Sequence, residues 1–198
     1  MEISQKAVVL AAIDILNREG IERLTMRALA QALEVKAPAL YWHIKNKQDL
    51  IDQIAEKMSA EMLPSCGLSD ARKYLFEFAR VYRQKLLEVR DGVAIFLRSY
   101  PSTPARCETI KNTLISLLHI GIKEKHCLVA AGMYNNYVLS FVADEVIFKA
   151  NPAGQPAFID TILGAGHEKM SFDEQFECGL NVLFAGFKTL EQAGKRRG

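Results

Sequence analysis

Apolar residues recur every three or four positions along most of the chain, the spacing that gathers them on one face of an α-helix. In the first such segment Val9, Ile13 and Leu16 form a stripe, Ser4 suits an N-cap and Gly20 suits a terminator. No segment alternates apolar and polar residues as a half-buried strand would, and no internal repeat stands out. The pattern predicts an all-α protein of about nine or ten helices.

Capping and turn residues divide this pattern into separate helices. Asn46 with Asp49, and Ser171 with Glu174, have the spacing of a capping box at the start of a helix. Proline, glycine and serine make residues 64–69 the clearest linker in the chain. Helices are expected at residues 4–19, 27–33, 38–43, 47–63, 69–90, 93–98, 105–119, 123–149, 158–163 and 171–190.

The segment Leu24–Lys47 predicts two short helices joined by a tight turn at Glu34-Val35. Pro38 suits the first turn of the second helix, where Leu40 and Ile44 would be buried. A surface that carries tryptophan, tyrosine and cations together is typical of a contact surface, and a helix inserted in the major groove of DNA would account for it. The alternative is a buried tryptophan beside ordinary solvated lysines. The residues expected to face outward are Tyr41, Trp42, His43, Lys45 and Lys47.

Two consecutive motifs lie in this segment. Leu-Thr-x-Arg-x-Leu-Ala-x-x-Leu begins at residue 24, and Pro-x-Leu-Tyr-Trp-His-x-Lys-Asn-Lys begins at residue 38. Together they resemble the tetracycline-repressor (TetR) family of bacterial transcription regulators, strongly over residues 4–60 and more loosely beyond. The resemblance implies a dimeric regulator, in most cases a repressor, that binds a palindromic double-stranded operator and is released by a small molecule. It also implies a three-helix helix-turn-helix DNA-binding domain at residues 1–46, a linking helix at 47–63 and a helical effector-binding and dimerisation domain at 64–198.

By this resemblance, one group of side chains holds the phosphate backbone and another meets the base edges. Ala37 and Ala39 stand where the tetracycline repressor has polar residues, which predicts a different operator, because alanine can still contact a thymine methyl group. Glu34 stands where the turn of the family usually has glycine, and a positive φ there would cost a non-glycine residue about 1 kcal/mol. The DNA-binding residues predicted in this way are Thr25, Arg27, Tyr41 and Lys47 for the phosphates and Lys36, Ala37, Pro38, Ala39, Trp42 and His43 for the helix that meets the bases.

Composition adds little to this picture. The net charge of +2 implies no partner by itself, although residues 21–48 hold five cationic and two anionic side chains, a modest basic face of the kind that supports DNA binding. The four cysteines are scattered and no signal peptide is recognised, so we expect reduced thiols in a cytoplasmic protein. No apolar run reaches the length of about 18 residues that spans a bilayer, and no membrane association is expected.

The last long helices, at residues 123–149 and 171–190, carry more apolar surface than one small core needs. Small residues let helices approach closely, so these two helices predict a homodimer interface of four helices, two from each protomer. A two-fold dimer also suits a palindromic operator. The alternative is that both faces close on their own chain. The small residues are Ala130, Ala131, Gly132, Gly179, Ala185 and Gly186.

Residues 87–101 resemble the tetracycline-binding branch of the family. Phe96, however, stands where that branch has a histidine that binds the magnesium of the drug. Leu63 and Phe78 replace polar residues that bind the drug itself. We therefore expect no metal and no cofactor, and an apolar or aromatic effector in place of magnesium–tetracycline. The alternative is that the aromatic residues are simply core. The predicted effector site comprises Phe78, Tyr82, Phe96, Ser99, Tyr100, Asn112, Tyr134, Asn135 and Asn136.

Enzymatic functions find no support in the sequence. The four histidines are dispersed, no Glu-x-x-His motif occurs, and there is neither a glycine-rich phosphate loop nor a Gly-x-Ser-x-Gly elbow. His126 and Cys127 are neighbours on a helix and point in different directions, so they do not form a metal site. The alternative to a DNA-binding regulator is a helical ligand-binding or scaffold protein without functional DNA binding, which would show no affinity for duplex DNA.

Overall fold

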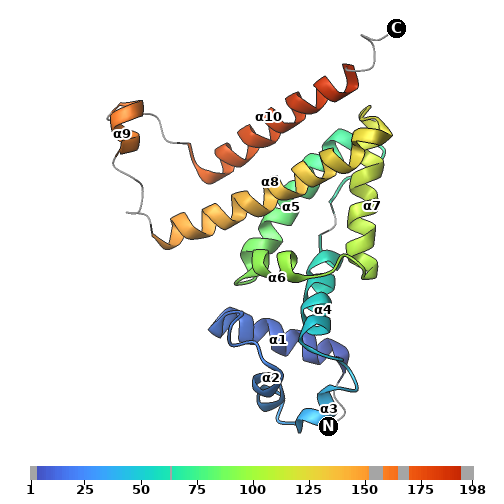
Figure 1. Cartoon of the computed structure of the whole chain (residues 1–198), viewed down its shortest axis with the longest axis vertical. Coiled ribbons are helices and arrows are strands. Elements are labelled where there is room, and N and C mark those ends of the chain that lie inside the picture. Colours follow the sequence, from blue (N-terminus) through green and yellow to red (C-terminus); the bar gives the residue numbers. More distant parts are fainter. Residues whose placement is uncertain (1–3, 63, 152–157, 165–169, 193–198) are drawn as a thin grey trace. The chain divides into compact units, whose positions relative to one another are not determined.

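Ten α-helices and no β-strand make up the described part of the chain, residues 4–62, 64–151, 158–164 and 170–192 of a computed structural model (Figure 1). The prediction of an all-α protein is confirmed. The chain divides into two units, Met1–Thr113 and Leu114–Gly198, which are described separately. The helices are α1 (Gln5–Glu19), α2 (Met26–Ala32), α3 (Ala37–Leu40), α4 (Lys47–Ala60), α5 (Ala71–Glu88), α6 (Gly92–Arg98), α7 (Pro104–His119), α8 (Glu124–Ala150), α9 (Phe158–Leu163) and α10 (Phe172–Gln192).

The first helices form a small unit because α1 packs against both α2 and α4. The hydroxyl of Ser4 accepts a hydrogen bond from the amide of Ala7 at 3.2 Å, which confirms it as the N-cap of α1. Gly20 ends the helix with a φ of 85°, a conformation that favours glycine. Val8, Ala12 and other apolar residues of α1 are fully buried, and each large side chain buried in this way contributes about 1.5–3 kcal/mol.

Several helix boundaries differ from the prediction, and α4, expected to extend to residue 63, ends at Ala60. Helix α3 ends at Leu40 and not near His43, because the amides of His43 and Ile44 both donate to the carbonyl of Leu40 at 2.9 Å and close a turn there. Helix α5 is capped by Asp70 and not by Ser69. The Asp70 carboxylate accepts from the amide of Lys73 at 3.0 Å and satisfies one of the free N–H groups of the first turn.

Helix α4 begins at the predicted cap. The side chain of Asn46 accepts from the amide of Asp49 at 2.9 Å, and the Asp49 carboxylate accepts from the amide of Lys45 at 2.8 Å. The carboxylate of Asp49 therefore bonds Lys45, the residue before the cap, whereas in a regular capping box it would bond the cap residue itself. Downstream, helical spacing predicts an apolar face of five residues on α5, and all five are buried, namely Leu75, Phe78, Ala79, Tyr82 and Leu86.

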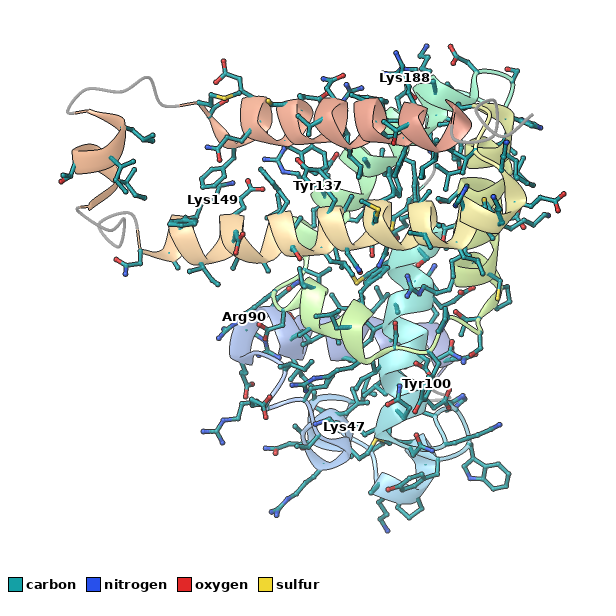
Figure 2. The ribbon with its side chains drawn as sticks, turned by 45° about the horizontal axis from the view of Figure 1, so that its top comes forward. Lys47, Arg90, Tyr100, Tyr137, Lys149 and Lys188 are labelled. Carbon is teal, nitrogen blue, oxygen red and sulfur yellow. The ribbon has the colours of Figure 1, made fainter. Side chains whose placement is uncertain are left out.

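Within the second unit α8 packs against α10. Tyr137 lies between these two helices in Figure 2 and donates a hydrogen bond to the carbonyl of Phe176 at 2.8 Å. A Cβ atom at Gly179 would lie 2.7 Å from ring carbons of Tyr137, so this glycine permits a close approach of α8 and α10 of one protomer. The predicted capping box of α10 is present, with the Ser171 amide donating to the Glu174 carboxylate at 2.7 Å and the Glu174 amide donating to the Ser171 hydroxyl at 3.2 Å.

Helical spacing predicts Leu128 on the apolar stripe of α8 with Ile147 flanking it, and Ile110 inward on α7, but these side chains lie on other faces. Leu128 and Ile147 of α8 are 75% and 63% exposed, because the buried face of this helix runs through Tyr134, Val138 and Val142 but is rotated toward Cys127 at its start. Ile110 of α7, expected to point inward, is 39% exposed, because burial along this helix begins only one turn later, at Thr113.

Candidate nucleic-acid interface and effector site

The reader, which we define as residues 24–47, is held by its own caps and turn. The hydroxyl of Thr25 accepts from the amide of Ala28 at 3.1 Å and starts α2. At the other end of α2 the amide of Glu34 donates to the carbonyl of Gln31, and that of Val35 donates to the carbonyl of Ala30 at 3.0 Å. This pair of bonds is a Schellman motif, which requires a left-handed residue after the helix. Glu34 supplies this residue with a φ of 55°, so the condition under which a non-glycine residue carries a cost is met here.

The outward face of the reader carries the aromatic and cationic side chains. Leu40 and Ile44 are fully buried beneath it, whereas Trp42 is 88% exposed and Tyr41 is 54% exposed. The alternative of a buried tryptophan is therefore wrong. A large apolar surface exposed beside cations is a property of contact sites. Of the ten residues predicted to bind DNA, Ala39 and His43 are half-buried, and the exposed ones are Thr25, Arg27, Lys36, Ala37, Pro38, Tyr41, Trp42 and Lys47.

Helix α4 is bonded to the chain around the end of α6 and the start of α7 by three side chains spaced one turn apart. The side-chain amide of Gln48 donates to the backbone carbonyl of Arg98 at 2.8 Å. The carboxylate of Asp52 accepts from the backbone amide of Tyr100, also at 2.8 Å. The carboxylate of Glu56 accepts from the first amides of α7, that of Ala105 at 2.9 Å among them. Nothing in the sequence indicated these three bonded side chains, because polar residues at this spacing look like an ordinary solvated helix face.

A second attachment joins the turn between α5 and α6 to the end of α1. Asp91, with a φ of 59°, accepts from the amide of Ile21 at 2.7 Å through its carboxylate. Arg90 donates from its backbone to the side chain of Asn17 at 2.9 Å and from its guanidinium to the carbonyl of Arg18 at 3.0 Å. Arg90 lies beside α1 in Figure 2. The reader and α6 are thus bonded to each other through α1 as well as through α4.

Part of the predicted effector site comes together in the first unit. Four rings form what we call the aromatic row: Tyr74 and Phe78 have ring centroids 6.1 Å apart, Phe78 and Tyr82 5.8 Å, and Tyr82 and Phe96 5.2 Å. The side chain of Asn112 hydrogen-bonds Tyr74 at one end of the row. Burial raises the pKa of the Tyr82 hydroxyl far above its ordinary value, and the nearby Arg106 guanidinium opposes that rise only in part.

The other predicted effector residues do not belong to the aromatic row. Ser99 is buried at the end of α6 and donates to the carbonyl of Phe96 at 3.1 Å, whereas the neighbouring Tyr100 is 63% exposed. Tyr134 belongs to the second unit and packs against Phe184 there, with Asn135 half-buried and Asn136 exposed. Leu63 lies outside the described residues.

Sequence reasoning also missed Arg106, whose guanidinium lies 4.3 Å from the ring centroid of Phe96. A single arginine near the start of a helix carries no signal in the sequence. Among the described residues no group of three or more histidine, cysteine, aspartate or glutamate side chains could hold a metal ion. None of the helices in these residues has the length and apolar character needed to cross a membrane.

Comparison with known proteins agrees with the helix-turn-helix geometry. Residues 8–54 match the family of bacterial regulatory proteins of the tetR family, and residues 63–157 match the tetracyclin repressor-like C-terminal domain. The tetracycline repressor protein class A from transposon 1721 of Escherichia coli is 36% identical over an alignment covering 93% of this chain and 90% of that protein. Among solved structures, BioQ with its double-stranded DNA operator has a TM-score of 0.73 at 28% identity, covering 93% of this chain and 98% of that one. A TetR variant of Acinetobacter baumannii AYE in complex with minocycline has a TM-score of 0.74 at 31% identity, covering 96% and 98%.

A helix-turn-helix reader joined to an all-α body defines a class of DNA-binding transcriptional regulators. The chain belongs to the TetR family of bacterial regulatory proteins. The family, the fold class and the class of function predicted from the sequence are thereby confirmed.

Proposed function

We propose that the chain is a homodimeric repressor that binds a palindromic operator and leaves it when a small apolar or aromatic effector binds. The observation that carries this proposal is the exposed pair Tyr41 and Trp42 on a reader whose opposite side is completely buried. Exposed rings beside cations have no part in the core of the protein, and they suit the phosphates and base edges of a DNA groove.

We assign the roles in the reader from the position of each side chain. Arg27 and Lys47 are exposed cations that contact phosphates, with Thr25 and Tyr41 beside them. Trp42 is the most exposed of the rings and would reach furthest into the groove. The remaining base-facing residues are Lys36, Ala37, Pro38, Ala39 and His43, of which the alanines offer methyl groups to thymine.

The proposed dimer forms through α8 and α10. Both helices expose large apolar side chains, and a Cβ atom at Gly132 or Gly186 would meet nothing within 4 Å, so these positions leave room for a helix from a second protomer. A two-fold dimer presents two readers to two half-sites about one helical turn of DNA apart. The exposed apolar residues are Leu128, Val129, Met133, Val146, Ile147 and Val182.

The proposed effector binds near the aromatic row. Phe78 and Phe96 supply ring surface where the tetracycline-binding branch has polar or metal-binding residues, so magnesium–tetracycline is a poor ligand here. Effector binding would displace the end of α6 and the start of α7. Because Gln48, Asp52 and Glu56 bond α4 to that same segment, α4 would move with it and change the separation of the two readers.

The test is a selection of binding sites from a random duplex library, with the wild type beside Arg27→Ala and Lys47→Ala. Enrichment of a palindrome by the wild type, with both variants weakened across all sequences, supports the proposal. Each variant should also lower the slope of log K against log salt by about 1 for each protomer. Lys111→Ala, which removes an exposed lysine of α7, is the matched control. No enrichment at low salt would favour the helical ligand-binding or scaffold protein.

A further inference from the structure

Arg106 near the start of α7 is placed against the aromatic row. Its guanidinium carbon lies 4.3 Å from the ring centroid of Phe96, which is itself 4% exposed, and its side chain hydrogen-bonds Tyr82. The arginine is half-buried. A cation over the face of an aromatic ring is attracted by the ring, and this contact holds the guanidinium plane against the row.

Within the described part of the chain, the charge of Arg106 is not balanced by an acidic side chain. Among the described residues no carboxylate forms an ion pair with its side chain, and its buried Nε atom has no hydrogen-bond partner. The hydroxyl oxygen of Thr103, one turn earlier, is likewise buried without a partner within the described chain. Buried polar atoms are normally paired, so an unused nitrogen and an unused hydroxyl three residues apart point to a partner from outside the protein.

Neither Glu56 nor Tyr82, which lie near Arg106, serves as an anionic partner of its side chain. The Glu56 carboxylate is already occupied by the backbone amides of Ala105 and Arg106, at 2.9 Å and 3.3 Å. Tyr82 is not an anion, because burial raises the pKa of its hydroxyl well above its ordinary value and keeps it protonated. The missing partner is therefore an acceptor, and an anionic one would also balance the charge of the guanidinium.

We propose that the effector is a planar aromatic molecule carrying a carboxylate, which Arg106 binds through its guanidinium edge while the rings pack against Phe96 and the rest of the aromatic row. This inference rests on the proposed function, since it names the chemical class of the effector. The planar guanidinium matches a carboxylate through two parallel hydrogen bonds. An aromatic body then adds the contact with the row that a small aliphatic acid would lack.

The test compares matched probes by calorimetric titration of the full chain. The probes are 2-naphthoate, ionised at pH 7, the uncharged 2-naphthamide of the same shape, and acetate as an anion without rings. We expect 2-naphthoate to bind wild type about 10- to 100-fold more tightly than 2-naphthamide, the range typical of charge-assisted hydrogen bonds. Acetate should bind far more weakly than either.

Substitutions of Arg106 test whether this residue causes the preference for 2-naphthoate over 2-naphthamide. Arg106→Met keeps the length of the side chain and should abolish the preference for 2-naphthoate, whereas Arg106→Lys keeps the charge and should retain part of it. Arg72→Met is the matched control, because Arg72 also lies over a ring, that of Phe76 at 5.2 Å, but is exposed on α5. Thermal unfolding of each variant shows whether it is folded.

Equal binding of 2-naphthoate and 2-naphthamide, a preference that survives in Arg106→Met, or no binding of 2-naphthoate would overturn the inference. Failure of the proposed function gives a different result. If the protein binds operator DNA and 2-naphthamide releases it as well as 2-naphthoate does, the regulator stands and only the acidic anchor is wrong. If no duplex is bound at all, the proposed function itself fails, whatever the probes do.

Discussion

The reader and the aromatic row use the same kinds of side chain in opposite ways. Trp42 of the reader is 88% exposed, whereas Phe78 and Tyr82 of the aromatic row are 5% and 3% exposed. A buried ring contributes to the free energy of unfolding, while an exposed ring contributes little to it and is open to a large partner such as DNA. Residue type alone therefore does not show whether a ring stabilises the fold; its burial does.

The largest effect is expected where a ring of the aromatic row is removed. Phe78→Ala should lower the free energy of unfolding by about 3–5 kcal/mol, because it deletes a buried ring and leaves a cavity between its neighbours. Urea denaturation followed by circular dichroism measures the loss. A loss below 1 kcal/mol would mean that the row is a loosely packed pocket wall and not part of the core.

The corresponding change in the reader should have the opposite profile. Trp42→Ala is expected to leave the free energy of unfolding within about 0.5 kcal/mol of wild type, because the ring is exposed. It should weaken binding to the selected operator by about 1–3 kcal/mol, the range of a good base contact. Fluorescence anisotropy with labelled operator measures the affinity. Normal operator binding by this variant would remove Trp42 from the interface.

A change between the two regions tests how they are joined. Glu56→Ala removes the carboxylate that accepts from the first amides of α7 and should lower the free energy of unfolding by about 1–2 kcal/mol. It should also require more effector to release the operator, because α4 loses one of its bonds to the start of α7. Glu108→Ala on α7, whose carboxylate forms an exposed pair with Lys111, is the control and should change neither quantity. Unchanged release in Glu56→Ala would argue against α4 as the link.

The smallest effect concerns the turn of the reader. Glu34→Gly should raise the free energy of unfolding by about 1 kcal/mol, because Glu34 has a φ of 55° and glycine adopts that conformation without a steric penalty. Ala32→Gly, two residues earlier at the last residue of α2, should instead destabilise, by at most about 1 kcal/mol. Both are measured by denaturation. Destabilisation by both changes would show that the side chain of Glu34 contributes more than its backbone conformation costs.

The reader could be predicted because its signals are local. The turn at Glu34 and the buried pair Leu40 and Ile44 lie within a few residues of one another, and each was found where the sequence placed it. The end of α3 could not be predicted as well, since it depends on two amides sharing the carbonyl of Leu40 and not on residue type. Exposure of Leu128 likewise depended on which side of α8 meets α10.

The sequence by itself determined the helical period, the caps of α1, α4 and α10, the helix-turn-helix motif and, through it, the family of this regulator. These properties arise from neighbours in the chain, whose spacing is visible without a fold. Only the tertiary structure decided that Arg106 lies over Phe96, that Glu56 holds the start of α7 and that Asp91 holds Ile21. Those contacts join residues from ten to seventy positions apart, and helix packing alone brings such residues within hydrogen-bonding distance.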